Sequence, residues 1–251
     1  MISLLRAELF KTRKRAMGWV LLAISALTIA LVMLNSALQN PSHVMYAFPG
    51  GLLPVGTVLP LLGVLVMILL GATSVGSEYG YDTWKNLLVH RPGRVPFILS
   101  KWLTLVVVIG LGLAVLLPWA QAVGLVLDAA LRLRGVTATP QLDTVLLLLL
   151  TQAVTPLVAG SFAILGAVIG RSSVAGIIAG IVWFIADALL GAVLQLASLS
   201  VDLHILQAQV NGVAVPGLYV AVASLAVAFY LVVPIAVAAI IFRQRDMVGA
   251  G

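Results

Sequence analysis

The sequence predicts an all-α integral membrane protein with six transmembrane helices. Three observations support this: the composition, the length of the apolar segments and the placement of basic residues. Of the 251 residues, 62% are hydrophobic and 9% are charged, whereas soluble domains carry about 25% charged residues. Such a chain cannot cover a water-facing surface. The charges fall at the ends of apolar segments, so we expect the net charge of +6 to face lipid headgroups or the cytoplasm and not nucleic acid.

Six segments are long and apolar enough to span the lipid bilayer, whose core is about 30 Å thick and requires about 20 residues in a helix. They are Ala16–Leu38, Leu52–Val75, Trp102–Leu127, Thr144–Ile169, Val174–Leu196 and Gly217–Phe242. The first two are separated by Asn35–Gly51, which contains Asn40-Pro41 and Pro49-Gly50-Gly51 and reads as a turn at the membrane surface. We expect one transmembrane domain over residues 1–251.

The basic residues predict the orientation of the helices, because cytoplasmic loops are enriched in Lys and Arg. With the N-terminus inside, the outer side carries only Arg132 and Arg134 of the 14 basic residues. The other 12 share the inner side: Arg6, Lys11, Arg13, Lys14, Arg15, Lys85, Arg91, Arg94, Lys101, Arg171, Arg243 and Arg245. We therefore expect a multi-pass protein of the cell membrane with both termini in the cytoplasm.

The first fifteen residues predict an amphipathic helix, because Ile2, Leu5 and Leu9 share one stripe while Arg6 and Lys11 lie off it. Such a helix can lie in the inner membrane interface. A basic anchor that only sets topology is the alternative. The uncharged run that follows is longer than the apolar region of a signal peptide, so we expect no cleavage.

The segment Ser77–Lys101 is the longest polar and charged stretch between two apolar spans. Asp82 or Thr83 can cap a short helix from Trp84 to about His90. Its residues Trp84, Leu87, Leu88 and Arg91 have i, i+3, i+4, i+7 spacing, typical of a helix that docks in a groove of another protein. An aromatic belt at headgroup level is the alternative.

Three sequence elements resemble the permease subunit of ABC-2 type ABC transporters. They are LLRAELFKTRKR before the first span, SEY…TWKNLL…R…FILSKWL after the second, and FRQRDM at the end. The resemblance implies that the N-terminal segment is a connecting helix and that the segment after the second span supplies a short cytoplasmic coupling helix. It also implies a separate nucleotide-binding ATPase subunit, and a dimer with a second permease copy or a paralogue.

On that resemblance, the residues that couple the chain to its ATPase are Glu78, Tyr79, Thr83, Trp84, Lys85, Leu87, Leu88 and Arg91. We expect no enzymatic activity in this chain, because a phosphate-binding loop needs a lysine after a glycine-rich turn. None of Lys11, Lys14, Lys85 and Lys101 follows such a turn. ATP and Mg²⁺ are therefore expected on the partner, with no cofactor in the permease.

Asp187 lies deep in the fifth predicted span, where a charged residue costs at least ~2.5–3.5 kcal/mol. Gln121, Gln152 and Gln195 are candidate partners of Asp187 along a translocation pathway, and a protonated or paired structural aspartate is the alternative.

The outer segment Ser198–Pro216 suits a short helix on the outer membrane face. Its polar residues have no metal-ligand spacing, so we expect no metal site.

The predicted function is therefore an ATP-driven exporter permease for an amphipathic or hydrophobic substrate such as a peptide antibiotic, drug or lipid. An ion-gradient-driven secondary transporter is one alternative, and pairs of ionisable residues within the membrane would favour it. A membrane scaffold that does not transport is the other.

Two glycine pairs, Gly166/Gly170 and Gly176/Gly180, match the small-residue pattern of close helix contacts, and predict packing of the fourth span on the fifth.

Overall fold

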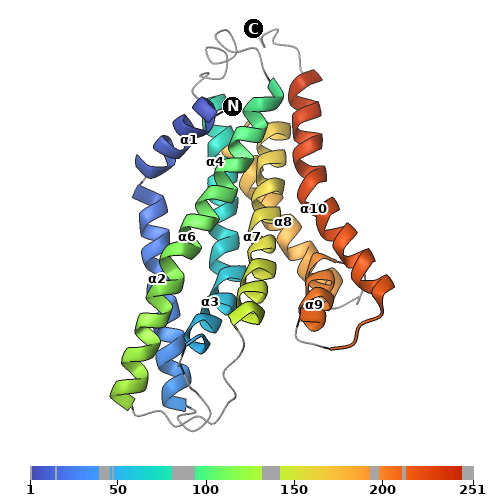
Figure 1. Ribbon diagram of the computed structural model, residues 1–251. Helices are drawn as coiled ribbons and strands as arrows, with labels where there is room; N and C mark the ends of the chain where they lie inside the picture. The colour runs from blue at the N-terminus through green and yellow to red at the C-terminus, as the bar shows by residue number, and fades with distance from the viewer. Residues whose placement is uncertain are drawn as a thin grey trace.

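The computed structural model describes residues 2–14, 16–39, 46, 48–80, 94–131, 142–192, 198–210 and 213–244. These residues form a bundle of helices without any strand, which confirms the all-α fold class (Figure 1). The helices are α1 (Ile2–Lys14), α2 (Ala16–Gln39), α3 (Leu53–Val58), α4 (Val64–Gly80), α6 (Arg94–Leu131), α7 (Leu142–Gly170), α8 (Ser173–Ala192), α9 (Leu199–Val210) and α10 (Gly217–Gln244). Around α3 lie a 3₁₀ turn, η1 (Gly50–Leu52), and a π-helical segment, η2 (Leu59–Gly63).

Six helical segments of the described chain are long and apolar enough to cross a membrane, and each coincides with one predicted span. The third departs most from its predicted bounds, because α6 begins at Arg94 and not at Trp102. Pro96 lies in the first turn of α6, where a missing N–H costs no intrahelical hydrogen bond. The predicted loop of residues 77–101 is thus too long, since α4 continues to Gly80 and the connection narrows to residues 81–93.

The second span is built from α3, η2 and α4 instead of one regular helix. Pro54 lies in the first turn of α3, whereas Pro60 follows the end of α3 and cannot donate to the preceding turn. A missing donor and a proline ring disturb the α-helical ladder, and a local π-helical turn is a common way to accommodate this. In the resulting irregular segment, α3 packs on α2, α6 and α7, and η2 packs on α7.

The most buried span is α7, with 61% of its apolar window inside the bundle. It packs closely against α4 and α8 through glycine and alanine. A Cβ atom at Gly176 would lie 2.7 Å from the Ala163 carbonyl oxygen, and one at Gly166 would overlap Ala179. The predicted packing of the fourth span on the fifth through small residues is therefore confirmed.

The two ends of the bundle carry different elements. At one end lie α1, the end of α4, the start of α6 and the end of α10, while α9 lies toward the other (Figure 1). The helix predicted within the segment Ser198–Pro216 is confirmed as α9. Large apolar side chains on α8 and α10 point outward, including Val174, Val182 and Leu225. Such an exterior suits contact with lipid.

Candidate functional site

Four charged side chains meet at the end of the bundle that carries α1, and we call Glu8, Lys11, Glu78 and Lys101 the ion cluster. Lys101 Nζ lies 2.7 Å from Glu8 Oε2 and 3.2 Å from Glu78 Oε1. Lys11 Nζ lies 2.7 Å from Glu78 Oε1 and 3.3 Å from Glu8 Oε1. Each ammonium group therefore contacts both carboxylates, and the four charges balance.

Three helices supply the ion cluster. Glu8 and Lys11 are three residues apart on α1, a spacing that places them on one face. Glu78 lies in the last turn of α4, and Lys101 lies two turns into α6. Because residues 81–93 join α4 to α6, the cluster ties together both ends of this connection and attaches them to α1.

The ion cluster is largely removed from water. The side chain of Lys101 is 1% exposed, whereas that of Lys11 is 44% exposed. Burial acts to lower the pKa of Lys11, but its hydrogen bond to Glu78 and the nearby carboxylates raise that pKa above its ordinary value. Buried ions are stable only with close partners of opposite charge. The cluster therefore favours one relative placement of α1, α4 and α6.

An aromatic group extends these contacts to α10. Lys101 Nζ lies 5.0 Å from the centre of the Phe97 ring, close enough for a cation–π interaction. Phe97 stacks on Phe242 with ring centres 5.3 Å apart. Tyr79 meets the same Phe242 ring edge-on at 6.5 Å. The last turns of α10 are thus packed against the residues that flank the connection on both sides.

Two of the predicted coupling residues, Glu78 and Tyr79, lie in this region, one in the ion cluster and the other against Phe242. The predicted coupling helix falls outside the described residues, and so do six of its candidate residues: Thr83, Trp84, Lys85, Leu87, Leu88 and Arg91. The described residues thus place the two ends of the predicted coupling segment beside the ion cluster.

Glu8 was not predicted as a site residue, because α1 was recognised by its apolar stripe and its basic residues. In the structure the inward face of α1 is centred on Glu8, with Leu5 and Leu9 half-buried beside it. One signal was available, because Glu8 is the single acidic residue among positions 1–15 and precedes Lys11 by three. The pairing of Glu8 with Lys101 has no signal in local sequence.

Among the predicted pathway residues, Asp187 and Gln121 form hydrogen bonds with different partners and not with each other. Asp187 Oδ1 accepts a hydrogen bond of 2.7 Å from the backbone N–H of Leu199, which begins α9. Gln121 Nε2 donates instead to the Tyr46 carbonyl oxygen at 3.1 Å. Gln152 is half-buried on α7, and Gln195 falls outside the described residues. The bond to Leu199 gives Asp187 a structural contact that joins α8 to α9.

A second buried carboxylate lies near Asp187. Asp202, on α9, is only 5% exposed, and its Oδ2 atom is buried without a hydrogen-bond partner among the described residues. Burial raises the pKa of Asp202 above its ordinary value of 3.8, and the negative charge of Asp187 raises that pKa further. The ionised form of Asp202 is therefore disfavoured in the folded protein.

We expect Asp202→Asn to raise the thermal stability of the protein at pH 8. Because the pKa of Asp202 is higher in the folded state, ionisation favours unfolding as pH rises above the ordinary carboxyl pKa. At about pH 3, below the ordinary carboxyl pKa of 3.8, the difference between variant and wild type should largely vanish, since Asp202 is then protonated in both the folded and the unfolded state. Unfolding temperatures in detergent at both pH values test this. Equal stability of the two proteins at pH 8 would contradict it.

Within the described segments, no three His, Asp or Glu side chains gather closely enough to hold a metal ion. The ion cluster consists of paired charges, because each ammonium group contacts both carboxylates. Its chemistry is suited to holding helices together and to transmitting a displacement between them.

Six candidate spans and a buried ion cluster at one end define a multi-pass membrane protein. A family model described as "ABC-2 family transporter protein" matches residues 4–187, more than two thirds of the chain, and the protein belongs to this family. The match runs from α1 into α8 and includes the whole ion cluster. Comparison with curated proteins finds no match, and comparison with solved structures also finds none.

Proposed function

We propose that the chain is the permease subunit of an ATP-driven ABC exporter and that a separate ATPase subunit docks on residues 81–93. Membership of an ABC-2 transporter family implies a nucleotide-binding partner in general. The observation that supports the docking position is the ion cluster, which joins Glu78 at the end of α4 to Lys101 near the start of α6. A force applied to residues 81–93 would act directly on both helices.

In this mechanism, closure of the ATPase subunits around ATP and Mg²⁺ pushes on the connection between α4 and α6. The ion cluster transmits the displacement to α1, because Glu8 and Lys11 are paired with Lys101 and Glu78. Phe242 transmits it to α10 through Tyr79 and Phe97. Buried, paired groups are suited to this role, since separating them leaves uncompensated charge.

The proposed setting is the cell membrane, with α1 and the end of α10 in the cytoplasm. Twelve of the fourteen basic residues support this orientation under the positive-inside rule, and α1 lies at the same end of the bundle as the end of α10 (Figure 1). The proposed substrate is amphipathic or hydrophobic, because few charged groups lie between the ends of the bundle. The working assembly would contain a second permease, either another copy or a paralogue.

A secondary transporter is the second candidate, and the proximity of Asp187 to Asp202 favours it. Paired carboxylates can bind and release protons. This candidate ranks lower, because Asp202 lies on α9, which is not among the six candidate spans. Transport that continues without nucleotide but stops when the proton gradient is dissipated would support it.

We expect the variant Trp84→Ala/Leu88→Ala to lose its ATPase subunit while still inserting in the membrane. Both residues belong to the predicted docking face, and truncating one anchor residue of a protein interface costs about 2 kcal/mol or more. Together the changes should lower retention of the partner by more than about tenfold. The measurement is mild-detergent purification of the tagged protein, with bound chains identified by mass spectrometry.

A matched control is Leu218→Ala/Tyr219→Ala, which removes an exposed leucine and an exposed aromatic residue at the opposite end of the bundle. This variant should retain the ATPase subunit at the wild-type level. If no nucleotide-binding chain co-purifies with the wild-type protein, even after crosslinking, the proposed function is wrong. Equal retention by both double variants would reject only the docking site.

A further inference from the structure

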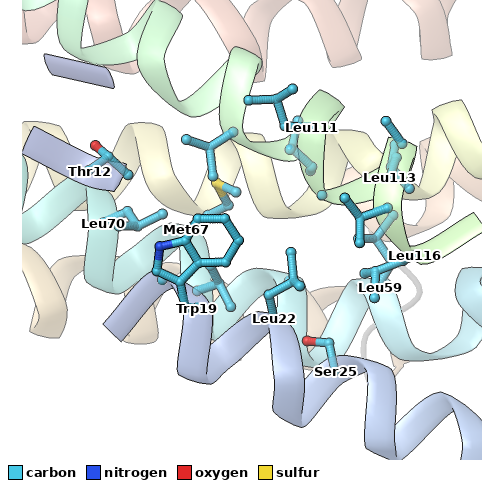
Figure 2. A pocket seen from close by; sticks show the side chains of 18 of the residues that line it. Thr12, Trp19, Leu22, Ser25, Leu59, Met67, Leu70, Leu111, Leu113 and Leu116 are labelled. Atoms are coloured by element: carbon cyan, nitrogen blue, oxygen red, sulfur yellow. The ribbon is translucent and has the colours of Figure 1, made fainter. Parts of the chain in front are cut away.

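A cavity of about 580 Å³ lies between α1, α2, α4 and α6. Figure 2 shows Leu22 and Ser25 of α2 on one side of it and Leu111 and Leu113 of α6 on the other. Trp19 and Leu111 line it and are 59% and 60% exposed, whereas Met67, at its back, is almost fully buried. The cavity therefore opens sideways, between two helices that can each span a membrane.

The wall of the cavity is aliphatic over most of its length. Ser25 lines it, but its hydroxyl group is already engaged, because it donates to the Leu21 carbonyl oxygen at 2.9 Å. Polar groups gather at the end formed by α1, where Thr12 and Arg13 line the cavity. Trp19 Nε1 donates to the Arg13 carbonyl oxygen at 3.0 Å and so links α1 to α2 at this corner.

A ligand that fits this cavity has a long apolar part and a negatively charged end. Arg13 is exposed beside the cavity, and the guanidinium group of arginine matches the geometry of phosphate oxygens. The volume lies within the range of about 300–1,000 Å³ that is usual for ligand sites.

We propose that this cavity binds an acyl chain of an acidic phospholipid from the leaflet that faces α1, with Arg13 at the headgroup phosphate. The chain enters between α2 and α6 and lies against Met67 and Leu70 of α4. An acyl chain in the bilayer is already out of water, so close van der Waals contact with the cavity wall favours its binding. The site is a property of the permease alone and does not depend on the proposed ATPase.

The cavity lies next to the ion cluster, so a bound lipid can affect the helices that form the cluster. Thr12, Leu70 and Val108 line the cavity and also line the narrow space around the ion cluster. A bound chain fills the space beside α1 and α4, next to the residues that hold these helices together. Occupancy of the cavity therefore stabilises the arrangement of α1, α4 and α6 in which the ion cluster is formed.

The test uses the full-length protein in nanodiscs that contain phosphatidylglycerol with a photoactivatable group in its acyl chain. Gly112 lines the cavity, and a Cβ atom there would meet nothing within 4 Å, so a side chain at position 112 can enter the cavity. We expect Gly112→Phe to lower labelling of the peptides that carry Leu22 and Met67 by about tenfold, because the ring overpacks the space that the acyl chain would occupy.

Gly110→Phe is the matched control. A Cβ atom at Gly110 also meets nothing within 4 Å, but two residues along a helix correspond to a rotation of about 200°, and Gly110 is not part of the cavity wall. Labelling of the cavity peptides should stay at the wild-type level. Equal labelling in the two variants would overturn the proposal.

A second comparison tests the headgroup. The same photoactivatable chain carried on phosphatidylcholine should label the cavity peptides less than phosphatidylglycerol does. Arg13→Gln should reduce this preference by about fivefold, the attraction that one basic residue contributes at an anionic membrane surface, while Lys14→Gln should reduce it less. Equal labelling by the two lipids in the wild-type protein would overturn the proposal, as would crosslinks between cavity residues of two copies in place of lipid adducts.

Discussion

Replacing Lys101 by methionine should lower the free energy of unfolding by about 3–5 kcal/mol, the usual cost of removing one partner from a buried ion pair. Methionine keeps much of the side-chain volume, so the loss arises mainly from charge. Glu8 and Glu78 would then share Lys11, which is partly exposed, while their own side chains stay buried. Denaturant unfolding of the purified protein in mixed micelles measures this difference.

Lys14→Met is the control for this substitution. Lys14 is an exposed residue of α1 whose ammonium group lies over the Phe10 ring, so its loss should change stability by less than about 1 kcal/mol. Adding Glu8→Gln to Lys101→Met should restore part of the lost stability, because Lys11 and Glu78 then remain as a balanced pair. If Lys101→Met is as stable as Lys14→Met, the result would contradict the burial of Lys101 between Glu8 and Glu78.

Gly176→Val should also destabilise the protein strongly, because it inserts side-chain atoms where α8 crosses α7 and α4. A Cβ atom at position 176 would lie 2.7 Å from the Ala163 carbonyl oxygen and 2.8 Å from Ala72 Cβ. The first contact is with backbone, which cannot move aside without shifting α7. Overpacking of this kind costs about 1–3 kcal/mol and sometimes more. The unfolding free energy in mixed micelles is again the measurement.

Gly110→Val provides the comparison for Gly176→Val. It makes the same change inside a long helix, but a Cβ atom at Gly110 meets nothing within 4 Å. The two variants share the effect of valine on helix propensity, so their difference isolates the helix crossing. Equal stability of the two variants would show that α4, α7 and α8 do not approach as closely as the structure places them.

The two predictions probe different parts of one mechanical unit. The small-residue crossing of α4, α7 and α8 makes a close-packed centre, and close-packed groups move as rigid bodies. The ion cluster, by contrast, joins the ends of α4 and α6 to α1 by charge pairing. In the proposed mechanism, a displacement that begins at residues 81–93 would thus be carried by rigid helices and concentrated at the ion cluster.

Much of the fold could be predicted from sequence. The six spans were found because the apolar length of a helix is a local property, and each predicted segment coincides with a helical segment of the structure, the second one being interrupted by η2. The bounds of the polar segment 77–101 were wrong, since Arg94 and Lys101 were read as loop residues although both belong to α6. A hydropathy argument assigns a lysine to water and cannot recognise one whose charge is balanced by buried carboxylates.

The candidate site was predicted only in part. Glu78 and Tyr79 were singled out as coupling residues, and the structure places them at Lys101 and Phe242. Glu8 was overlooked, because one acid among basic residues resembles an ordinary solvated side chain. Asp202 was not among the predicted site residues, and its burial near Asp187 depends on how α9 packs against the bundle.

By itself, the sequence determined six segments that are long and apolar enough to cross a membrane, the uneven placement of basic residues between them, and the transporter family that the chain resembles. These properties depend on composition and on residues near one another in the chain. Only the tertiary structure decided that Glu8, Glu78 and Lys101 meet, and that an apolar cavity lies between α1, α2, α4 and α6. The physical reason is that these contacts join residues from separate helices, and helix packing alone brings them within reach.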